Sequence, residues 1–373
     1  MDGRKRALAD AALRRIILIP LPFERNLTGR TVLVTGHTGF TGSWLCLWLA
    51  RLGVRVVGFA LPPPTDPSLF IDAGVESDVE SVIGDIRDYD AVLGVMSRTR
   101  PDAVIHLAAQ PLVRRSYREP LETFSINAMG TANVLEATRT TDGTRAILCV
   151  TTDKVYWNDG DARPRREDDR LGGGDPYSSS KAAAEMVIDG YRHAFGGGMA
   201  IAAARGGNIV GGGDWAEDRL IPDFVRAVTG GGRLSLRYPD AVRPWQHVLA
   251  LVQGYVAILN ALLGDDPSPV ARAWNLGPVD TRVYTVRDIL EMMSCHWVRP
   301  EMEYARDMDV AECPVLTLDS GLARTILEWR PPWDTARTIR ETADWYKGYY
   351  VGKMAARDLT LSQLHAWRAE LTR

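Results

Sequence analysis

The first two hundred residues alternate short apolar runs with longer stretches of helix-forming residues. Apolar runs of this length, bounded by glycine or polar residues, are typical of strands buried on both faces of a parallel sheet. We expect such strands at residues 30–35, 54–59, 82–88, 103–110, 146–150 and 199–205. Helices are expected between them, at 43–51, at 121–138 and from Pro176 onward. This alternation predicts an α/β fold with a doubly wound parallel sheet of the Rossmann type.

The second half of the chain has a less regular pattern. A glycine-rich segment, 206–215, is interpreted as a flexible crossing into a smaller lobe. Residues 274–277 return to strand-like character, and 320–350 predict amphipathic helices that pack on the body. We therefore expect four parts: a loosely ordered extension (1–22), a dinucleotide-binding domain (23–207), a mixed α/β substrate lobe with segments that return to the first domain (208–350), and a helical tail (351–373).

The first strand leads directly into a glycine-rich loop, Gly36-x-x-Gly39-x-x-Gly42, and then into a helix. Glycines at these places let the backbone turn tightly and approach a pyrophosphate at the N-terminus of the helix. Glycine triplets alone are weak evidence, but their placement between a strand and a helix favours a dinucleotide site. The side chains and backbone expected to contact the cofactor here belong to Gly36, Thr38, Gly39, Phe40, Thr41 and Gly42.

The ends of the next strands supply further candidates for the cofactor site. An acidic residue at the end of the second strand would select NAD and an arginine would select NADP, but residues 60–66 place neither at the expected position. NADP is therefore not excluded. Asp85, with Ile86 beside it, could meet the adenine amino group. The expected lining after the fourth strand is Leu107, Ala108, Ala109 and Gln110. His106 is expected to be packed and hydrogen-bonded, and the Asn127 amide to brace the active-site strand.

Candidate chemistry is most concentrated between residues 151 and 181. Thr152-Asp153-Lys154 follows the buried run 146–150, so a strand end would present a hydroxyl, a carboxylate and an amine. Tyr177 and Lys181 are four residues apart on the following helix and therefore share a face. The chain has 44 basic residues, but only five are lysines, and two of these lie in the two motifs. Lysine can lose its proton when buried, whereas arginine stays charged, so the pattern indicates proton transfer or the need for a compact cation. Chance placement of surface lysines is the alternative reading.

Composition narrows the function classes. The chain is 46% hydrophobic over 373 residues, enough for a large core, and its net charge of -3 with no basic stripe argues against nucleic acid. The four widely spaced cysteines are Cys46, Cys149, Cys295 and Cys313. They indicate reduced thiols in a cytoplasmic protein, and no metal site is expected. Residues 1–22 only faintly resemble a signal peptide, and no apolar run reaches membrane-spanning length.

Arginines beside apolar and aromatic residues mark the second lobe. Arg219-Leu220 and Arg243-Pro244-Trp245 would suit an anionic ligand with a flat base, because guanidinium matches diphosphate oxygens and tryptophan can face a ring. Ordinary surface arginines are an equally good reading of these residues alone.

Taken together, the motifs resemble the extended short-chain dehydrogenase/reductase family, and within it the CDP-glucose 4,6-dehydratases. The segments that carry this resemblance are TGHTGFTGSW (35–44), HLAAQPLVRRSY (106–117), TTDKVY (151–156), GGGDPYSSSKAAAE (172–185), GGGDWAEDRLIPD (211–223), RPWQHV (243–248) and WNLGP (274–278). They cover roughly residues 23 to 350. TDK, where the dTDP-glucose dehydratases have TDE, and RPWQHV point to the cytidine-nucleotide branch.

The resemblance implies NAD in the first lobe and a nucleotide sugar across the cleft. By this likeness Tyr177, its pKa depressed by Lys181 and the cofactor, takes the sugar 4-hydroxyl proton while hydride leaves C4. Lys154 removes the C5 proton, Asp153 protonates the departing C6 hydroxyl, and Thr152 binds the C4 oxygen. Hydride then returns to C6 and gives CDP-4-keto-6-deoxyglucose. The residues implied at the nucleotide and diphosphate are Asn208, Arg219, Leu220, Arg243 and Asn275. The family also implies a homodimer, paired through the helices that carry Tyr177 and Asn127.

The chain departs from the family pattern at three places. Thr41 stands where lysine is common, and segments 158–166 and 311–314 differ from family sequences that are expected to border the substrate pocket. Three alternatives stay open: a 4,6-dehydratase for another nucleotide sugar, a nucleotide-sugar 4-epimerase, and a dinucleotide-sensing regulator without catalysis. An epimerase would use Tyr177 and Lys181 but has no task for Asp153 and Lys154.

Overall fold

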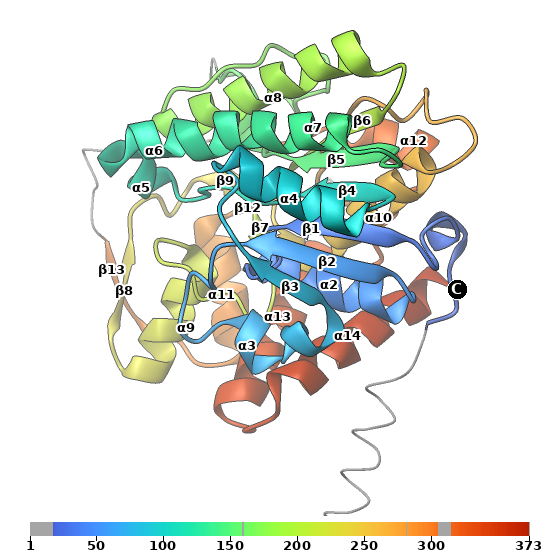
Figure 1. The fold of residues 1–373 in the computed structure, drawn as a ribbon. Coiled ribbons are helices and arrows are strands. Elements are labelled where there is room, and N and C mark those ends of the chain that lie inside the picture. Colours follow the sequence, from blue (N-terminus) through green and yellow to red (C-terminus); the bar gives the residue numbers. More distant parts are fainter. Residues whose placement is uncertain (1–17, 159, 281, 305–314, 373) are drawn as a thin grey trace, which may run out of the picture.

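The computed structural model describes residues 18–158, 160–280, 282–304 and 315–372. Its centre is a seven-stranded sheet of order β11-β6-β5-β4-β1-β2-β3 in which all neighbours are parallel (Figure 1). The strands are β1 (Thr31–Thr35), β2 (Arg55–Ala60), β3 (Glu80–Ile83), β4 (Ala103–His106), β5 (Ala146–Val150), β6 (Ala200–Gly206) and β11 (Ala273–Leu276). The strand order reverses between β1 and β4, where open α/β sheets bind ligands. The predicted doubly wound parallel sheet is confirmed.

Both faces of this sheet are covered by helices (Figure 1). Successive side chains of a strand point to opposite faces, so Val32 and Val34 of β1 belong to one core cluster and Leu33 to the other. One layer contains α2 (Phe40–Arg51), α10 (Val248–Leu262) and α14 (Ala356–Leu371); the other contains α4 (Tyr89–Thr99), α7 (Gly130–Thr140) and α8 (Pro176–Phe195). Burial on both sides explains why the strands are apolar at nearly every position.

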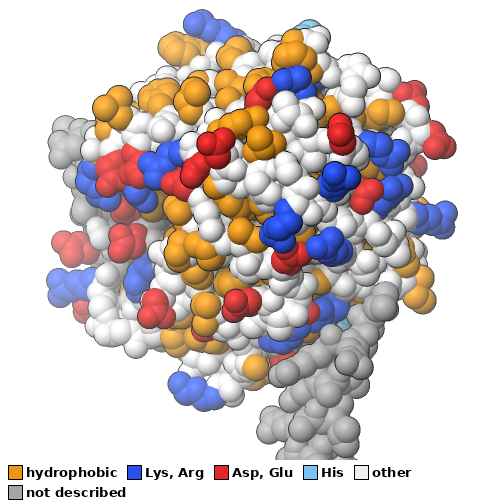
Figure 2. Space-filling model, in the orientation of Figure 1, with side chains coloured by type: hydrophobic (Ala, Val, Ile, Leu, Met, Phe, Trp, Pro, Cys, Tyr) orange, Lys and Arg blue, Asp and Glu red, His pale blue; other side chains and the backbone are white. Residues whose placement is uncertain are grey.

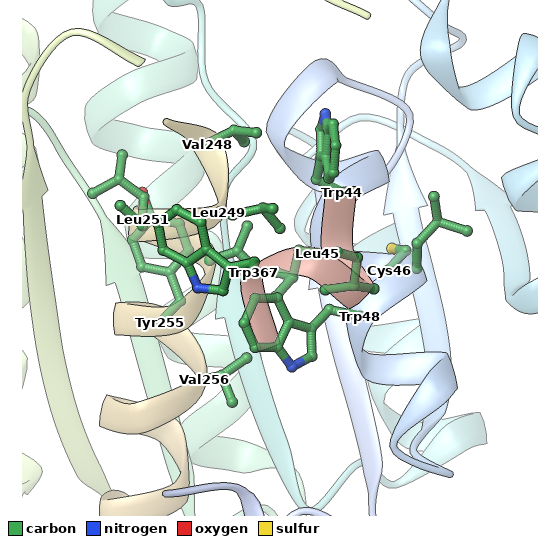
Figure 3. Close-up of a cluster of buried hydrophobic side chains, with 14 of the residues drawn as sticks. Trp44, Leu45, Cys46, Trp48, Val248, Leu249, Leu251, Tyr255, Val256 and Trp367 are labelled. Atoms are coloured by element: carbon green, nitrogen blue, oxygen red, sulfur yellow. The ribbon is translucent and has the colours of Figure 1, made fainter. Parts of the chain in front are cut away.

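The densest part of the core lies between α2, α10 and α14. Trp44 and Trp48 of α2 pack near Leu249 of α10 and Trp367 of α14, and all four side chains are fully buried (Figure 3). Helix α10 is buried around almost its whole circumference, which is the pattern of a core helix rather than a surface helix. The helix that follows the glycine loop is therefore held rigidly against the C-terminal half of the chain.

The two ends of the described chain meet beneath this core. Glu24, in η1 (Pro22–Glu24), is fully buried, accepts a hydrogen bond from Trp48 Nε1 at 2.7 Å and forms an ion pair with Arg368 of α14. Leu18 donates its backbone N–H to Arg51 at 2.6 Å, and the Ile19 carbonyl accepts from Arg368. Leu18 and Ile19 are therefore hydrogen-bonded to the body of the protein, and the boundary of the predicted extension at residue 22 stays a prediction. Residues 1–17 lie outside the described residues.

Two predicted boundaries are wrong for identifiable reasons. The third strand was expected at 82–88 but runs from Glu80 to Ile83, because the chain turns at residues 85–88, where the Asp88 N–H donates to the Asp85 carbonyl at 3.0 Å. The expected fourth strand ends at His106, and the small residues after it leave the sheet. The helix expected at 121–138 is a continuous run of three pieces: α6 (Pro120–Phe124), the π-helical η3 (Ser125–Met129) and α7.

Smaller elements complete the molecule. The first domain also contains α3 (Leu69–Asp72), η2 (Val75–Asp78), α5 (Val113–Arg118) and η4 (Asp153–Val155). The later part contains β7 (Ile209–Val210), α9 (Leu220–Gly230), β8 (Arg233–Leu236), β9 (Val242–Arg243), β10 (Gln246–His247), β12 (Tyr284–Thr285), α11 (Val286–His296), β13 (Glu301–Tyr304), α12 (Gly321–Ile326) and α13 (Thr335–Tyr350). Three two-stranded pairs form there: β10-β7, β12-β9 and β13-β8. The division at residue 207 stays a prediction; β11 and α10 pack with the first domain.

The surface and the thiols add few constraints. Figure 2 shows basic and acidic side chains interspersed over one face of the molecule. None of the helices in the described ranges is long and apolar enough to span a membrane, and no cluster there has three metal-ligating side chains. Cys46 and Cys149 are buried free thiols and Cys295 is an exposed one, whereas Cys313 lies outside the described residues.

Candidate active site

A cavity of about 1120 Å³ opens along the carboxyl ends of the central strands. Its lining is drawn from the segments that follow β1, β2, β3, β4, β5 and β6, and from the second lobe. The predicted site residues that line it are Gly36, Thr38, Gly39, Phe40, Thr41, Gly42, Asp85, Ile86, Leu107, Ala108, Ala109, Gln110, Thr152, Asp153, Lys154, Tyr177, Lys181, Asn208, Arg219, Leu220 and Arg243. Segments far apart in sequence thus form one continuous site.

The loop after β1 has the geometry of an anion cradle. Gly36 adopts φ +76°, and a Cβ there would lie 2.8 Å from the backbone nitrogen of Ala108. A Cβ on Gly42 would lie 2.1 Å from the Gly36 carbonyl oxygen. Gly39 is the N-cap of α2 and offers no side chain to the first N–H groups of that helix. Those N–H groups can therefore bind a pyrophosphate, so the site fits a dinucleotide.

The remaining predicted cofactor residues surround this loop. Asp85 pairs with Arg87 at 2.6 Å, and hydrogen bonds from Arg87 hold the pKa of the Asp85 carboxyl below its usual range. Asn127, on the π-helical turn η3, does not line the cavity. Its amide accepts from the Gln110 N–H at 2.9 Å and donates to the Gln110 carbonyl and to Ser180 Oγ. It therefore braces the segment after β4, rather than the strand that leads to Thr152.

His106 is a packed, hydrogen-bonded residue, as predicted. Its Nδ1 lies 2.7 Å from Thr35 Oγ1 and its Nε2 lies 3.0 Å from Thr131 Oγ1. Burial lowers its pKa to about 3, so the ring stays neutral near pH 7. Its role is to hold β4 against β1 below the cavity.

The carboxylate and the amine of the Thr-Asp-Lys motif lie on a single turn, η4, at the end of β5. Thr152 caps this turn by accepting from the Lys154 N–H, and its hydroxyl donates to Asp153 Oδ1 at 3.0 Å. Asp153 is 3% exposed, and its Oδ2 has no hydrogen-bond partner among the described residues. Burial raises its pKa, despite the opposing charge of Lys154. A carboxyl group in this state can donate a proton into the cavity.

Helix α8 brings the phenol and the second amine to the same cavity. Asp175 caps the helix at the Ser178 N–H, and Pro176 is its first residue, as predicted. The Tyr177 N–H donates to Ser116 Oγ at 3.1 Å. Lys181 Nζ donates to the carbonyl of Val150, the last residue of β5, at 3.1 Å. These contacts fix the helix face relative to the end of the strand.

The pKa values of this pair differ from the expectation of a depressed phenol. Burial raises the pKa of Tyr177 to about 12, and a hydrogen bond with Thr152 only partly opposes it. Burial lowers the pKa of Lys181 to about 8, with Glu185 acting in the opposite direction. The protein alone therefore does not activate the phenol, because desolvation outweighs the local charges.

Arginines define the opposite end of the cavity. Arg219 forms an ion pair with the buried Asp214 at 2.9 Å, and the charge of Asp214 raises the pKa of the Arg219 guanidinium. Arg243 is 6% exposed and its charge acts on Asp153, so it lies near the acid turn. Sequence reasoning missed other cavity arginines, namely Arg114, Arg115, Arg118, Arg226 and Arg237. Two of these lie in the quoted motif HLAAQPLVRRSY, whose doubled arginine was the available signal.

Asn275 is the predicted substrate residue that the structure does not bring to the cavity. It is fully buried on β11, where its amide accepts from the Tyr156 hydroxyl at 2.6 Å and donates to the Arg165 carbonyl at 2.8 Å. Its hydrogen-bonding groups are therefore engaged inside the protein. None of the described residues of segment 158–166 lines the cavity either; this loop pairs with residues 317–319 instead. Segment 311–314 lies outside the described residues.

Comparisons with known proteins agree with this geometry. Residues 32–277 match the model of the NAD dependent epimerase/dehydratase family. The chain is 40% identical, over 87% of its length and 92% of the relative, to CDP-glucose 4,6-dehydratase of Salmonella typhimurium. It is 27% identical, over 85% and 93%, to dTDP-glucose 4,6-dehydratase of Xanthomonas campestris. A crystal structure of Thermus thermophilus UDP-glucose 4-epimerase in complex with NAD has a TM-score of 0.74 at 25% identity, covering 85% of this chain and 99% of the epimerase. From its motifs, its fold and these similarities, the chain belongs to the NAD dependent epimerase/dehydratase family.

Proposed function

We propose that the protein dehydrates CDP-glucose to CDP-4-keto-6-deoxyglucose with the help of bound NAD. The observation that carries this proposal is the turn with Asp153 and Lys154, which faces the same cavity as Tyr177 and Lys181. A 4,6-dehydratase needs both pairs, one for C4 oxidation and one for elimination. The relative that is 40% identical acts, by its name, on CDP-glucose, and this supports the choice of substrate.

NAD fits the cofactor end better than NADP. The charged side chains that line the cavity from residues 60–69 and 84–86 are two carboxylates, Asp66 and Asp85. The neighbouring guanidinium of Arg87 is engaged by Asp85 and by Glu122. A 2′-phosphate would face these carboxylates without a free cation from either segment, and this favours the unphosphorylated ribose. The charge of these two segments supports NAD where the sequence leaves the choice of cofactor open.

The oxidation step uses the α8 pair. Tyr177 takes the proton from the sugar 4-hydroxyl, and Thr152 hydrogen-bonds the C4 oxygen. NAD, when bound, supplies the acceptor for the C4 hydride and later the donor of a hydride to C6. Lys181 is mostly charged at pH 7 with a pKa of about 8, so it can stabilise the phenolate. Its charge, together with that of the oxidised cofactor, must offset the burial that raises the pKa of Tyr177.

The elimination step uses the turn at the end of β5. A ketone at C4 acidifies the C5 hydrogen, which Lys154 removes as a proton. Asp153 gives its proton to the C6 hydroxyl, so water leaves and a C5–C6 double bond forms. The raised pKa of Asp153 suits it to this acid role. Return of the hydride to C6 and of a proton from Lys154 to C5 completes the product. The proton that Tyr177 took from the 4-hydroxyl replaces the one that Asp153 gave to the departing hydroxyl, so one water is lost with no net oxidation.

The test is incubation of purified protein with CDP-glucose, dTDP-glucose and GDP-mannose in separate reactions. We expect a product eighteen daltons lighter than the substrate with CDP-glucose only. If one of the other two sugars gave a product eighteen daltons lighter, the protein would still be a dehydratase, but its substrate would be that sugar and not CDP-glucose. A product of unchanged mass with altered configuration at C4 would identify an epimerase and overturn the proposal, and no product from any sugar would favour a non-catalytic dinucleotide sensor.

We also infer a homodimer in the cytoplasm. Helices α6, η3 and α8 expose large apolar side chains, with Leu121 86%, Met129 59% and Met186 55% exposed. Apolar side chains gathered on adjacent helices are typical of a protein–protein interface. The free thiols Cys46, Cys149 and Cys295 suit a reducing compartment. Light scattering of the wild type and of Met129→Glu tests the dimer; a monomeric wild type would remove it.

A further inference from the structure

A buried polar network lies directly behind the acid and base groups, and sequence reasoning did not identify it. Its centre is Arg205 on β6, which is 4% exposed. Arg205 donates from Nε and Nη2 to the two carboxylate oxygens of Glu185 at 3.0 and 2.9 Å. From Nη1 it donates to the Tyr156 hydroxyl at 2.8 Å. Neither Arg205, Glu185 nor Tyr156 lines the cavity, so none of them touches the sugar.

The network holds the acid turn at both of its ends. On the side before Asp153, Thr151 Oγ1 donates to Glu185 Oε1 at 2.5 Å. On the side after Lys154, the Tyr156 hydroxyl accepts from Arg205 and donates to Asn275 Oδ1 at 2.6 Å. Asp153 and Lys154 therefore lie between Thr151 and Tyr156, whose side chains are both linked to the guanidinium of Arg205, the first through Glu185 and the second directly.

The same guanidinium also reaches the helix that carries the tyrosine and lysine pair. Glu185 lies one helical turn after Lys181 on α8 and faces the same side of the helix. Burial acts to raise the pKa of Glu185, but Arg205 and Thr151 together hold it below its usual value, so the carboxylate stays charged. Arg205 thus connects η4 to α8, the two elements that carry the two halves of the proposed chemistry.

The anchor at Tyr156 is itself fixed from outside. The Asn275 side-chain oxygen on β11 accepts a hydrogen bond from the Tyr156 hydroxyl, and the Asn275 backbone N–H donates to Glu167 Oε1 at 2.9 Å. Burial raises the pKa of Tyr156 well above its ordinary value, so the phenol stays a neutral donor. This explains why Asn275 is absent from the cavity: its amide holds the acid turn through Tyr156.

We propose that Arg205, through Glu185 and Tyr156, is a positioning residue that sets the place of Asp153 and Lys154 relative to Tyr177 and Lys181. The proposal rests on the proposed dehydration, because it concerns the relation of the oxidation groups to the elimination groups. Displacement of a reacting group by about 1 Å can cost about a hundredfold in rate. Loosening the anchor at Tyr156 therefore affects elimination more than oxidation.

The test separates these two steps in a single turnover with CDP-glucose. Absorbance of the reduced nicotinamide rises when C4 is oxidised and falls when hydride returns to C6. In Tyr156→Phe we expect the rise to stay within about twofold of wild type and the fall to slow about tenfold or more, so reduced cofactor accumulates. Tyr191→Phe is the matched control, because it removes a hydroxyl of α8 that donates to Glu136 of α7, and neither residue lines the cavity.

The outcomes are distinct. Equal slowing of rise and fall, or no change in either, overturns the positioning role even if the melting temperature drops. If Tyr156→Phe does not fold, Thr151→Val removes the hydroxyl at the other end of the turn, and the ratio of the two rates decides in the same way. Wild-type turnover judges the proposed function separately: if the wild type forms no dehydrated product, that proposal fails before any variant is compared.

Discussion

The two ends of the cavity are built on different principles. The cofactor end consists of backbone and small side chains, such as Gly36 and Ala108, in segments that directly follow adjacent strands. The substrate end consists of long cationic side chains, such as Arg219 and Arg243, from loops and short strands of the second lobe. Asp153 and Lys154 lie between them. We therefore expect the first end to bind through shape and N–H groups and the second through charge, so different substitutions should damage each.

The largest effect is expected where the two ends meet. Lys154→Ala removes the proposed base, so C4 oxidation should continue while product formation falls about a hundred- to ten-thousandfold. Rapid-mixing absorbance of the reduced cofactor and mass spectrometry of the sugar measure the two steps. Lys347→Ala, on α13 and outside the cavity lining, is the control. Unchanged turnover of Lys154→Ala would remove the base assignment.

The cofactor end should be the less tolerant of added volume. In Gly42→Ala the new Cβ would lie 2.1 Å from the Gly36 carbonyl oxygen, so the loop must shift. We expect the free energy of unfolding to fall by about 3 kcal/mol or more and NAD to bind more weakly. Chemical denaturation and calorimetric titration with NAD are the measurements. Gly94→Ala, on α4 with open space around it, should be neutral or slightly stabilising. Normal NAD affinity in Gly42→Ala would contradict the cradle geometry.

The substrate end should respond through charge. Arg219→Ala removes the guanidinium proposed to contact the diphosphate, so we expect KM for the nucleotide sugar to rise about ten- to hundredfold with NAD affinity nearly unchanged. The melting temperature should fall as well, because the buried Asp214 loses its ion-pair partner. Arg219→Lys should fall between the two, because it keeps the charge and loses the forked geometry. Arg139→Ala on the far helix α7 is the control. If Arg219→Ala weakened NAD binding as much as it weakened sugar binding, the proposed division into a cofactor end and a substrate end would be contradicted.

The effect that is smallest at neutral pH concerns the acid stability of the loop after β1, through His37. Burial lowers the pKa of His37 to about 4, below its ordinary 6.5, so the folded protein resists a proton that the unfolded chain binds. The contribution of His37 to the free energy of unfolding is therefore fully present above pH 6.5. It is lost by about 1.4 kcal/mol per pH unit as the pH falls from 6.5 to 4. His37→Gln should flatten the pH dependence of the unfolding free energy by that slope. Parallel curves for wild type and variant would show that His37 does not titrate in this way.

Much of the cofactor end was predictable because its residues are contiguous with the strands that place them. The glycine loop and the run 107–110 each follow a recognisable apolar strand, and strand ends meet at one edge of a parallel sheet. Errors there were local: a turn at residues 85–88, closed by a hydrogen bond from the Asp88 N–H to the Asp85 carbonyl, ends the third strand earlier than predicted. Tyr177 and Lys181 were predictable for a similar reason, since helical spacing alone puts them on one face.

Asn275 illustrates what the pattern of residues did not reveal. Its amide belongs to a motif that resembles a substrate site, yet its partners, Tyr156 and Arg165, are more than a hundred residues away along the chain. Arg205 and Glu185 likewise read as an unremarkable pair of charged residues until β6 and α8 are packed together. The raised pKa of Tyr177 also depends on burial by several elements, which no local sequence window reports.

The sequence by itself determined the parallel sheet, the dinucleotide loop and the chemical groups available for the reaction, because strand periodicity and local spacing specify these. Only the tertiary structure decided which charges are buried, which arginines reach the cavity and which side chains hold the acid turn in place. These depend on contacts between segments distant in the chain, and on the desolvation that those contacts impose.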